Sequence, residues 1–380
     1  MLDFSLSEEH KALMDTARRF AKERIIPVAA ECDHKAQFPK DVFNAAWEIG
    51  LVNSTVPEAY GGNGMHEIEN TLIGEELAYG CIGIETTMEA NTLAATPIIL
   101  AGSEEQKKKY LGMLTAEPIF AAYATSEPGA GSDVAAMSCK FTKVGDDYVL
   151  NGAKAWITNA TLSTFFVIFA TSDVTKKHNG IAAFIVDRDT PGITVGKHED
   201  KLGQRASDTA GITFEDVKVP AANLLAPEGK GFKLAMETFN QTRPAIAAGA
   251  AGLMRRCLDE CVAYAKDRKT FGTPIGNHQM VASMLAEMAI RIEATQLLYR
   301  KAAWNIDHGV RDPIVSSFAK AFGADAAMQT ATDAVQIFGG YGYVKEYPVE
   351  KLFRDAKLLQ IYEGTSQIQR IVIARQLMSR

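Results

Sequence analysis

A block of short β-type segments between two helical regions most constrains what this chain can fold into. From Glu117-Pro118 to about residue 228, β-branched and aromatic residues alternate or run together in about seven short segments. Turn residues such as Pro128-Gly129, Asn151-Gly152 and Pro191-Gly192 separate these segments. Short strands at such close spacing are typical of an antiparallel barrel or sandwich rather than a parallel sheet.

The regions on either side of this block have the apolar spacing of amphipathic helices. Near the N-terminus, Ser5 and Glu8 have the spacing of a capping box, and Pro27 is expected to kink or divide the first helix. A second helix should carry Val42 to Ile49, two more should occupy roughly 66–100, and another should start at Ser103. After Gly229 the predicted helices are 231–268, 277–309, 313–338 and 365–378, and helices this long pack as a bundle.

Composition excludes several classes of protein. A net charge of −6 argues against nucleic acid as a partner, and no run of apolar residues is long enough for a membrane span. The five cysteines show no CxxC spacing. Cys257 and Cys261 are four residues apart on a predicted helix, without a nearby histidine, which favours reduced core thiols over a metal site. We therefore expect no metal and a reducing compartment.

The usual motifs of nucleophilic and metal-dependent hydrolysis are also missing. The sequence contains no G-x-S-x-G, H-E-x-x-H or P-loop, and its seven histidines form no cluster. A single carboxylate that acts as general base, with a cofactor for the difficult step, fits these absences better.

The segment QIYEGTSQIQR, residues 360–370, places one carboxylate at a candidate helix start. Ser366 and Gln369 have capping-box spacing, so Glu363 and Gly364 are expected on the turn just before a helix. A lone glutamate in such a turn is usually a solvated residue.

Four other segments combine residues that suit ligands, and each also has a structural explanation. YATSEPGAGSD (123–133) suits close approach of backbone to a ligand or a polar hairpin loop, and Val134 replaces the third glycine of a dinucleotide fingerprint. In AWITNA, Trp156 suits an aromatic ligand or the core. RKTFG (268–272) could bind a pyrophosphate and an aromatic ring. Its structural explanation is a cationic side chain that interacts with the dipole at a helix C-terminus. QIFGGYGY (336–343) is explained by a helix C-cap.

Together these segments resemble the acyl-CoA dehydrogenase family. EPGAGSD, WIT, RKTFG, QI-x-GG-x-G and QIYEGTSQIQR occur in the family's order and rough spacing, and the match runs from the first helix to the last. The chain is most similar to the medium-chain members, through EELAYGC (75–81), KKKYL (107–111), TRP (242–244), AEMA (286–289) and EYPVEKL (346–352). The resemblance implies an α-helical N-terminal domain at 1–117, an antiparallel β-barrel middle domain at 118–228 and a C-terminal four-helix bundle at 229–380.

The resemblance also implies a flavoprotein that binds FAD non-covalently, as a homotetramer in which pairs of subunits complete each FAD site. The residues implied around the flavin of the same subunit are Tyr123, Thr125, Ser126, Gly131, Ser132, Trp156, Ile157 and Thr158. Those implied to reach the FAD of the neighbouring subunit are Arg268, Thr270, Phe271, Gln279, Gln336, Gly339 and Gly340. Thr365 and Gln367 would complete the site near the adenine half. Those implied to meet the acyl-CoA are Ser132, Glu89, Phe239, Asn240, Thr242, Arg243, Tyr362 and Gly364.

By the same resemblance, Glu363 is the catalytic base. It would remove an α-proton of a short- to medium-chain acyl-CoA while a β-hydride passes to the flavin, and electrons would leave to electron-transfer flavoprotein, as in fatty acid β-oxidation. Its backbone N–H and a flavin ribityl hydroxyl would stabilise the developing enolate. In some members the catalytic base stands at the position that matches Thr242, but a threonine cannot act as the base here. Asn240 replaces an Asp of the medium-chain members, and Ala90 replaces a Gly near the expected floor of the acyl pocket.

Two other functions compete with this one. An acyl-CoA oxidase would return the electrons to oxygen, although the chain lacks that class's C-terminal extension. A non-catalytic relative would bind only the CoA ester or the flavin, which gives no reason for the carboxylate of Glu363. The N-terminus has neither a signal-peptide apolar region nor an Arg-rich transit segment. We therefore expect a bacterial cytoplasmic protein or a mature protein of the mitochondrial matrix.

Overall fold

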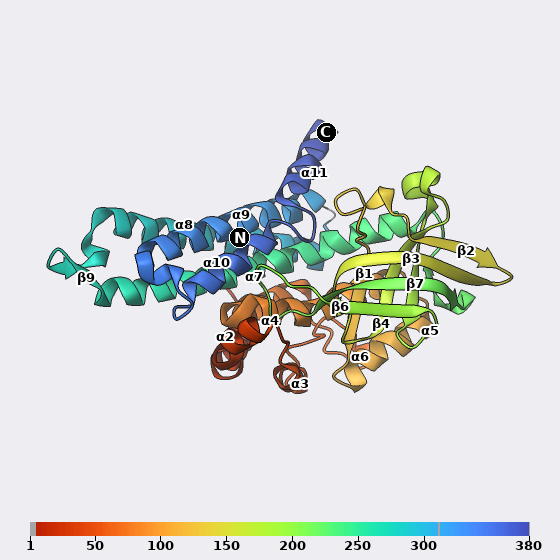
Figure 1. Cartoon of the computed structure of the whole chain (residues 1–380), viewed down its shortest axis with the longest axis horizontal. Coiled ribbons are helices and arrows are strands. Elements are labelled where there is room, and N and C mark those ends of the chain that lie inside the picture. The colour runs from red at the N-terminus through yellow and green to blue at the C-terminus, as the bar shows by residue number, and fades with distance from the viewer. Residues whose placement is uncertain (1–4, 311, 380) are drawn as a thin grey trace.

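The structure, a computed structural model, describes residues 5–310 and 312–379. A helical part comes first, a β-sheet second and a helical bundle third, which confirms the predicted fold class. Figure 1 shows an elongated molecule with the sheet at one end and the long helices running away from it. Within the described ranges, none of the helices has the length and apolarity needed to cross a bilayer.

The N-terminal helices follow the predicted order, with one change at the first cap. The cap of the first helix is Ser7, whose Oγ accepts a hydrogen bond from the N–H of His10 at 3.1 Å, so the predicted cap at Ser5 is wrong. Pro27 lies in the first turn of α2, directly after a π-helical segment, and divides the helix as expected. The elements are α1 (Glu8–Phe20), η1 (Ala21–Ile25), α2 (Ile26–Lys35), α3 (Lys40–Glu48), α4 (Glu67–Ala101), α5 (Glu104–Gln106), η3 (Lys107–Leu111) and α6 (Gly112–Ala116).

Helix α4 crosses the middle of the molecule and forms one wall of the later site. It contains the two predicted helices, which follow each other directly within 35 residues and are separated by a kink at Cys81, where φ is −166° and ψ is 112°. The helix packs closely on α7 (Gly231–Asp267), because a Cβ on Gly252 would lie 2.1 Å from the carbonyl oxygen of Glu75. This glycine lets the two backbones approach each other directly.

The middle part is an eight-stranded sheet in the order β6-β7-β3-β2-β4-β5-β8, with β1 paired to β4. Most neighbours are antiparallel, but β1 and β2 each pair with β4 in parallel. Along β4, Phe165, Val167 and Phe169 enter one core and Phe166 and Ile168 enter another, which explains the continuous apolar run. The strands are β1 (Phe120–Ala124), β2 (Lys140–Val144), β3 (Asp147–Thr158), β4 (Ser163–Thr171), β5 (Ile181–Asp187), β6 (Ile193–His198), β7 (Thr209–Val219) and β8 (Leu224–Ala226).

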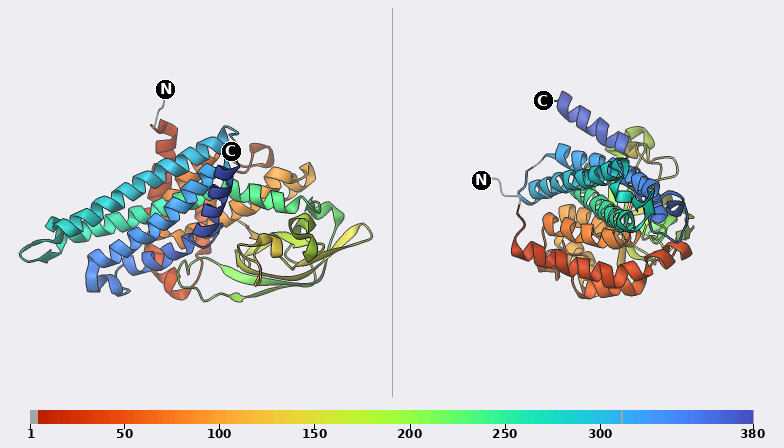
Figure 2. Two further views of the ribbon diagram at one scale, coloured as in Figure 1. Left: turned by 90° about the horizontal axis from the view of Figure 1, so that it is seen from above. Right: turned by 90° about the vertical axis from the view of Figure 1, so that its left-hand side faces the viewer.

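The C-terminal part contains the four predicted long helices and one that the sequence analysis missed. The missed helix, α10, buries Val349, Leu352, Ala356 and Leu359, and this helical spacing was the signal that could have found it. Figures 1 and 2 show α11 standing out from the body. The elements are α7, β9 (Lys269–Thr270), β10 (Thr273–Pro274), α8 (Gln279–Asp307), α9 (Pro313–Phe338), η8 (Gly339–Tyr343), α10 (Val349–Leu359) and α11 (Ser366–Met378).

Candidate active site

One cavity collects residues from all three parts of the chain. Helix α4 forms one wall, the ends of β1 and β3 form a second, and α7 with the turn before α11 forms a third. Its lining residues are Glu85, Thr86, Glu89, Ala90, Leu93, Tyr123, Thr125, Ser126, Trp156, Ile157, Thr158, Phe239, Thr242, Ile246, Tyr362 and Glu363.

The turn at Glu363 has a backbone conformation that few residues adopt. Glu363 has φ 55° and Gly364 has φ 86°, and left-handed φ in a residue with a side chain costs free energy and is often found at functional sites. Lys320 Nζ on α9 donates to the Gly364 carbonyl at 2.6 Å, and Gln369 Nε2 donates to the carbonyls of both turn residues. A Cβ on Gly364 would lie 2.6 Å from Gln369 Nε2. These contacts hold the Glu363 side chain at the cavity.

The cap of α11 differs from the predicted capping box. Thr365 Oγ1 accepts a hydrogen bond from the N–H of Ile368 at 3.1 Å, so Thr365 is the N-cap. Ser366, the predicted cap, is the first helical residue, and its Oγ donates to Asp325 Oδ1 at 2.8 Å. Gln369 binds the preceding turn. The prediction of a helix start after Glu363 is confirmed, but its cap is one residue earlier.

The environment of Glu363 moves its pKa close to neutral. Burial raises the pKa of this carboxyl, while the Arg243 guanidinium, the hydrogen bond from Thr242 and the Lys320 ammonium lower it, with a result of about 7. Thr242 Oγ1 lies 3.1 Å from Glu363 Oε2. Burial also lowers the pKa of Lys320 to about 7. A carboxylate with a pKa near the working pH can both take up and release a proton readily.

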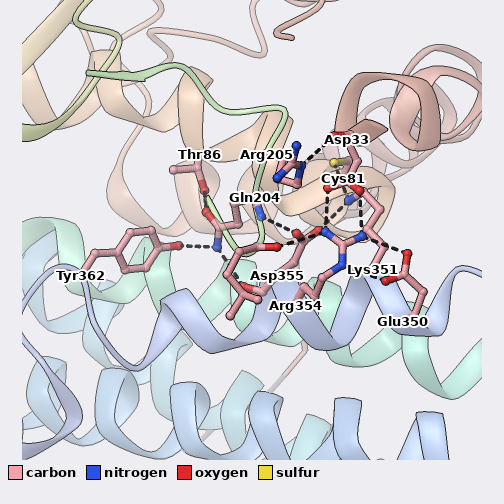
Figure 3. A network of polar contacts seen from close by, with 11 residues as sticks. Asp33, Cys81, Thr86, Gln204, Arg205, Glu350, Lys351, Arg354, Asp355 and Tyr362 are labelled. Carbon is pink, nitrogen blue, oxygen red and sulfur yellow. Dashed lines mark hydrogen bonds and ion pairs between the residues drawn. The ribbon is translucent and has the colours of Figure 1, made fainter. Parts of the chain in front are cut away.

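A network of buried polar groups holds Tyr362, the residue before Glu363 (Figure 3). Gln204 Nε2 donates to Tyr362 Oη at 3.4 Å, and Gln204 Oε1 accepts from Thr86 Oγ1 at 3.0 Å. The Gln204 N–H makes a short hydrogen bond to Asp355 Oδ1, and Lys351 Nζ donates to Asp355 Oδ2 at 2.5 Å. The network thereby joins the turn before Glu363 to the cavity wall on α4 and to α10.

The residues expected at the flavin of the same subunit separate into two groups. Tyr123, Thr125, Ser126, Trp156, Ile157 and Thr158 line the cavity. Trp156 is 63% exposed, so it is not a core residue. Gly131 and Ser132 are exposed on the loop that follows β1 and lie outside the lining.

The residues expected at a neighbouring subunit lie far from the cavity. RKTFG forms the β9–β10 hairpin at the tip of the bundle, at the opposite end of the molecule from the sheet (Figure 1). Phe271 has φ 49° in this turn and is 99% exposed. Arg268, Gln279, Gln336, Gly339 and Gly340 are exposed, and Thr270 is partly buried. Gln367 is exposed on the first turn of α11.

The residues expected at the substrate mostly surround the cavity. Glu89, Phe239, Thr242 and Tyr362 line it, and Gly364 follows in the Glu363 turn. Arg243 is buried, and its Nη1 donates to Asn240 Oδ1 at 2.8 Å.

Several cavity residues were missed by the sequence analysis. Glu85, Thr86 and Leu93 stand on the face of α4 that also carries Glu89. Helical spacing from Glu89 could have found them. Lys320 contacts the turn from a distant helix, and no local pattern marks it.

Comparison with known proteins identifies the family. Family models for the N-terminal, middle and C-terminal domains of acyl-CoA dehydrogenases match residues 7–117, 122–217 and 229–378. A probable mitochondrial medium-chain specific acyl-CoA dehydrogenase 2 of Caenorhabditis briggsae is 50% identical over 99% of this chain and 92% of its own length.

Two solved structures are similar over nearly the full length of both chains. Butyryl-CoA dehydrogenase from Megasphaera elsdenii has a TM-score of 0.96 and 39% identity, over 99% of this chain and 100% of its own. A chain from a structure of the electron transferring flavoprotein of Acidaminococcus fermentans has a TM-score of 0.97 and 40% identity, over 100% of both chains. The chain therefore belongs to the acyl-CoA dehydrogenase family of flavin-dependent oxidoreductases.

Proposed function

We propose that this protein is an FAD-dependent acyl-CoA dehydrogenase that converts short- to medium-chain acyl-CoA into trans-2-enoyl-CoA. The observation that carries the proposal is the Glu363 carboxyl, which lines the shared cavity with a pKa of about 7. Its relatives include enzymes named for medium-chain and butyryl substrates.

The cavity wall formed by β1 and β3 fits a bound flavin. Tyr123 Oη and Thr125 Oγ1 are buried there without a hydrogen-bond partner in the described residues, and buried polar groups of this kind are usually satisfied by a ligand or water. Together with Ser126, Trp156 and Thr158, they would hold the ring system. When bound, FAD supplies the acceptor for the β-hydride.

Glu363 removes the α-proton in this proposal. A thioester α-C–H is a very weak acid, so the charge that develops on the carbonyl oxygen needs hydrogen-bond donors. The backbone N–H of Glu363 has no acceptor within the part of the chain that the structure describes, which leaves it available as one donor. Thr242 orients the carboxyl from α7, and the Phe239 side chain on the same helix forms an apolar part of the cavity wall.

Anaerobic titration of the purified holoenzyme with straight-chain acyl-CoAs from butyryl to palmitoyl tests this function. We expect flavin bleaching, with the largest kcat/KM for the short to medium chains. A preference for branched or aromatic acyl groups would contradict the chain-length assignment, and no bleaching by any acyl-CoA would overturn the function.

The rate of bleaching should rise with pH through about 7. Glu363 must be deprotonated to accept the α-proton, and burial raises its pKa to about 7, so the active fraction grows as the pH passes that value. Stopped-flow bleaching at saturating substrate between pH 5.5 and 9 measures the midpoint of this pH dependence. The midpoint reports the pKa of Glu363 in the enzyme–substrate complex, which differs from that of the free enzyme. A Lys320→Met control removes one charge that lowers the pKa, so its midpoint should move to higher pH. A profile that is flat in both proteins would contradict the assignment of the base.

Two partners belong to the same proposal. The exposed Phe271 hairpin and the exposed residues around η8 fit contact with FAD in a neighbouring subunit of a homotetramer. Similarity to a chain in a structure of electron transferring flavoprotein supports electron transfer to such a partner, and abundant peroxide during aerobic turnover would favour an oxidase instead.

A further inference from the structure

We propose that the inner end of the cavity binds acyl tails that end in a hydrogen-bond donor, a hydroxyl or an ammonium group, in preference to tails that end in methyl. This inference rests on the proposed dehydrogenase function and specifies its substrate class. It is carried by Glu85 and Glu89, which line the cavity, and by Asn53, which lines a smaller hollow behind them.

Two carboxyls stand side by side on the α4 wall. Glu85 and Glu89 are one helical turn apart, so both face the same side of the helix. Both line the cavity that contains Glu363, and both also line a second, smaller hollow with Asn53, Asn70 and Thr92. The pair therefore separates the two spaces, at the place where the far end of an acyl chain would arrive.

The polar groups of this region are only partly satisfied by the chain itself. Glu85 is only 5% exposed, and its carboxyl has no hydrogen-bond partner among residues 5–310 and 312–379. Asn53 Oδ1 is buried without a partner, since the Asn53 amide nitrogen already donates to the Leu114 carbonyl at 2.9 Å. Glu89 is better satisfied, because Asn70 Nδ2 donates to it at 3.4 Å and the Thr92 hydroxyl also interacts with it. Because an unpaired buried polar group costs free energy, an occupant that donates hydrogen bonds is favoured here.

The charges around the pair point to the same class of tail. The nearby cations, Arg243 and Lys320, lie at the Glu363 turn, and neither contributes to the electrostatics of Glu85 or Glu89. Burial raises the pKa of Glu85 well above its ordinary value and that of Glu89 to about 8. A neutral carboxyl has an O–H donor and a C=O acceptor, so it can pair with a hydroxyl in either direction, and it can lose its proton to pair with an ammonium. A tail that ends in carboxylate would add negative charge to a site without a cation.

Matched substrates of equal size test the proposal. We would compare 6-hydroxyhexanoyl-CoA with heptanoyl-CoA, and 8-hydroxyoctanoyl-CoA with nonanoyl-CoA, by kcat/KM for flavin bleaching. The ω-amino and ω-carboxy analogues of each length complete the series. We expect the hydroxyl to be preferred over methyl by at least about tenfold in one length, because a site built to bind a hydroxyl discriminates against its absence. The ω-carboxy compounds should be the poorest.

Two variants locate the effect at the pair. Glu85→Leu should reverse the preference toward methyl-terminated tails, whereas Glu85→Gln keeps an acceptor and should retain the preference for hydroxyl. Met88→Leu, in the smaller hollow, is the matched control, because it changes shape but not polarity and should leave the ratio unchanged.

The outcomes separate this inference from the proposed function. Bleaching by methyl-terminated tails that equals or exceeds bleaching by the hydroxyl tails at both lengths overturns the inference and leaves the dehydrogenase intact. An unchanged ratio in Glu85→Leu also overturns it. If no acyl-CoA of any kind bleaches the flavin, the proposed function and the inference fail together. If Glu85→Leu does not fold, the ratios of kcat/KM for hydroxyl-terminated over methyl-terminated tails in the wild type decide whether the inference holds.

Discussion

Replacement of Glu363 by Gln is expected to slow flavin bleaching by acyl-CoA by about 10²–10⁴-fold, which is the usual contribution of a general base to the rate. The amide has nearly the shape of the carboxyl and can still accept the hydrogen bond from Thr242, but it cannot take up the α-proton. Stopped-flow bleaching under anaerobic conditions, with a substrate that saturates the wild type, measures the loss.

The FAD content of Glu363→Gln should equal that of the wild type, which separates loss of the base from loss of the cofactor. Retained bleaching would assign the base elsewhere. The cavity offers Glu89 and Glu85 as the other carboxyls, both with raised pKa values, so Glu89→Gln is the variant to combine with Glu363→Gln in that case.

Local sequence patterns predicted most of the helices and strands, because their apolar spacing survives into the folded protein. The continuous run in β4 and the stripe in α7 are examples, and both are buried as expected. The errors concern helix N-caps, at places where two neighbouring residues could each accept the capping hydrogen bond. Ser5 and Ser7 both suit a cap, as do Thr365 and Ser366, and the geometry of the first turn decides.

The candidate site was less predictable, because contacts distant in sequence assemble it. By its local sequence Glu363 is a solvated turn residue, and only the tertiary fold buries its carboxyl, which raises its pKa, and brings it to Thr242 and Arg243, more than a hundred residues earlier, which lower the pKa in part. Lys320 and Glu85 carry no motif, and their positions depend on how α9 and α4 pack. The Phe271 ring is almost fully exposed and meets only the nearby His278 ring among the aromatic contacts of the described residues, so its role in a neighbouring subunit does not follow from one chain.

Loss of Lys154 is expected to destabilise the fold by about 3–5 kcal/mol, the usual cost of leaving a buried charge without its partner. Lys154 Nζ lies 2.7 Å from Glu127 Oε1 and also donates to the Thr125 carbonyl at 3.2 Å, and both charged side chains are almost fully buried. Glu127 further accepts hydrogen bonds from the N–H groups of Ser138 and Cys139. The pair thus anchors the EPGAGSD loop beneath Thr125, which lines the cavity.

A double-variant cycle tests this account by urea unfolding. Lys154→Met and Glu127→Gln should each lower the free energy of unfolding, and the double variant should lose less than the sum, because the uncompensated charge is gone from both partners. Since Thr125 depends on Lys154 for its position, Lys154→Met should also retain less FAD after gel filtration. Lys143→Met, on an exposed position of β2, is the control and should change stability by less than about 0.5 kcal/mol. Strictly additive losses in the cycle would show that the two charges do not act as a pair, and the loop would then owe its position to the amide contacts of Glu127 alone.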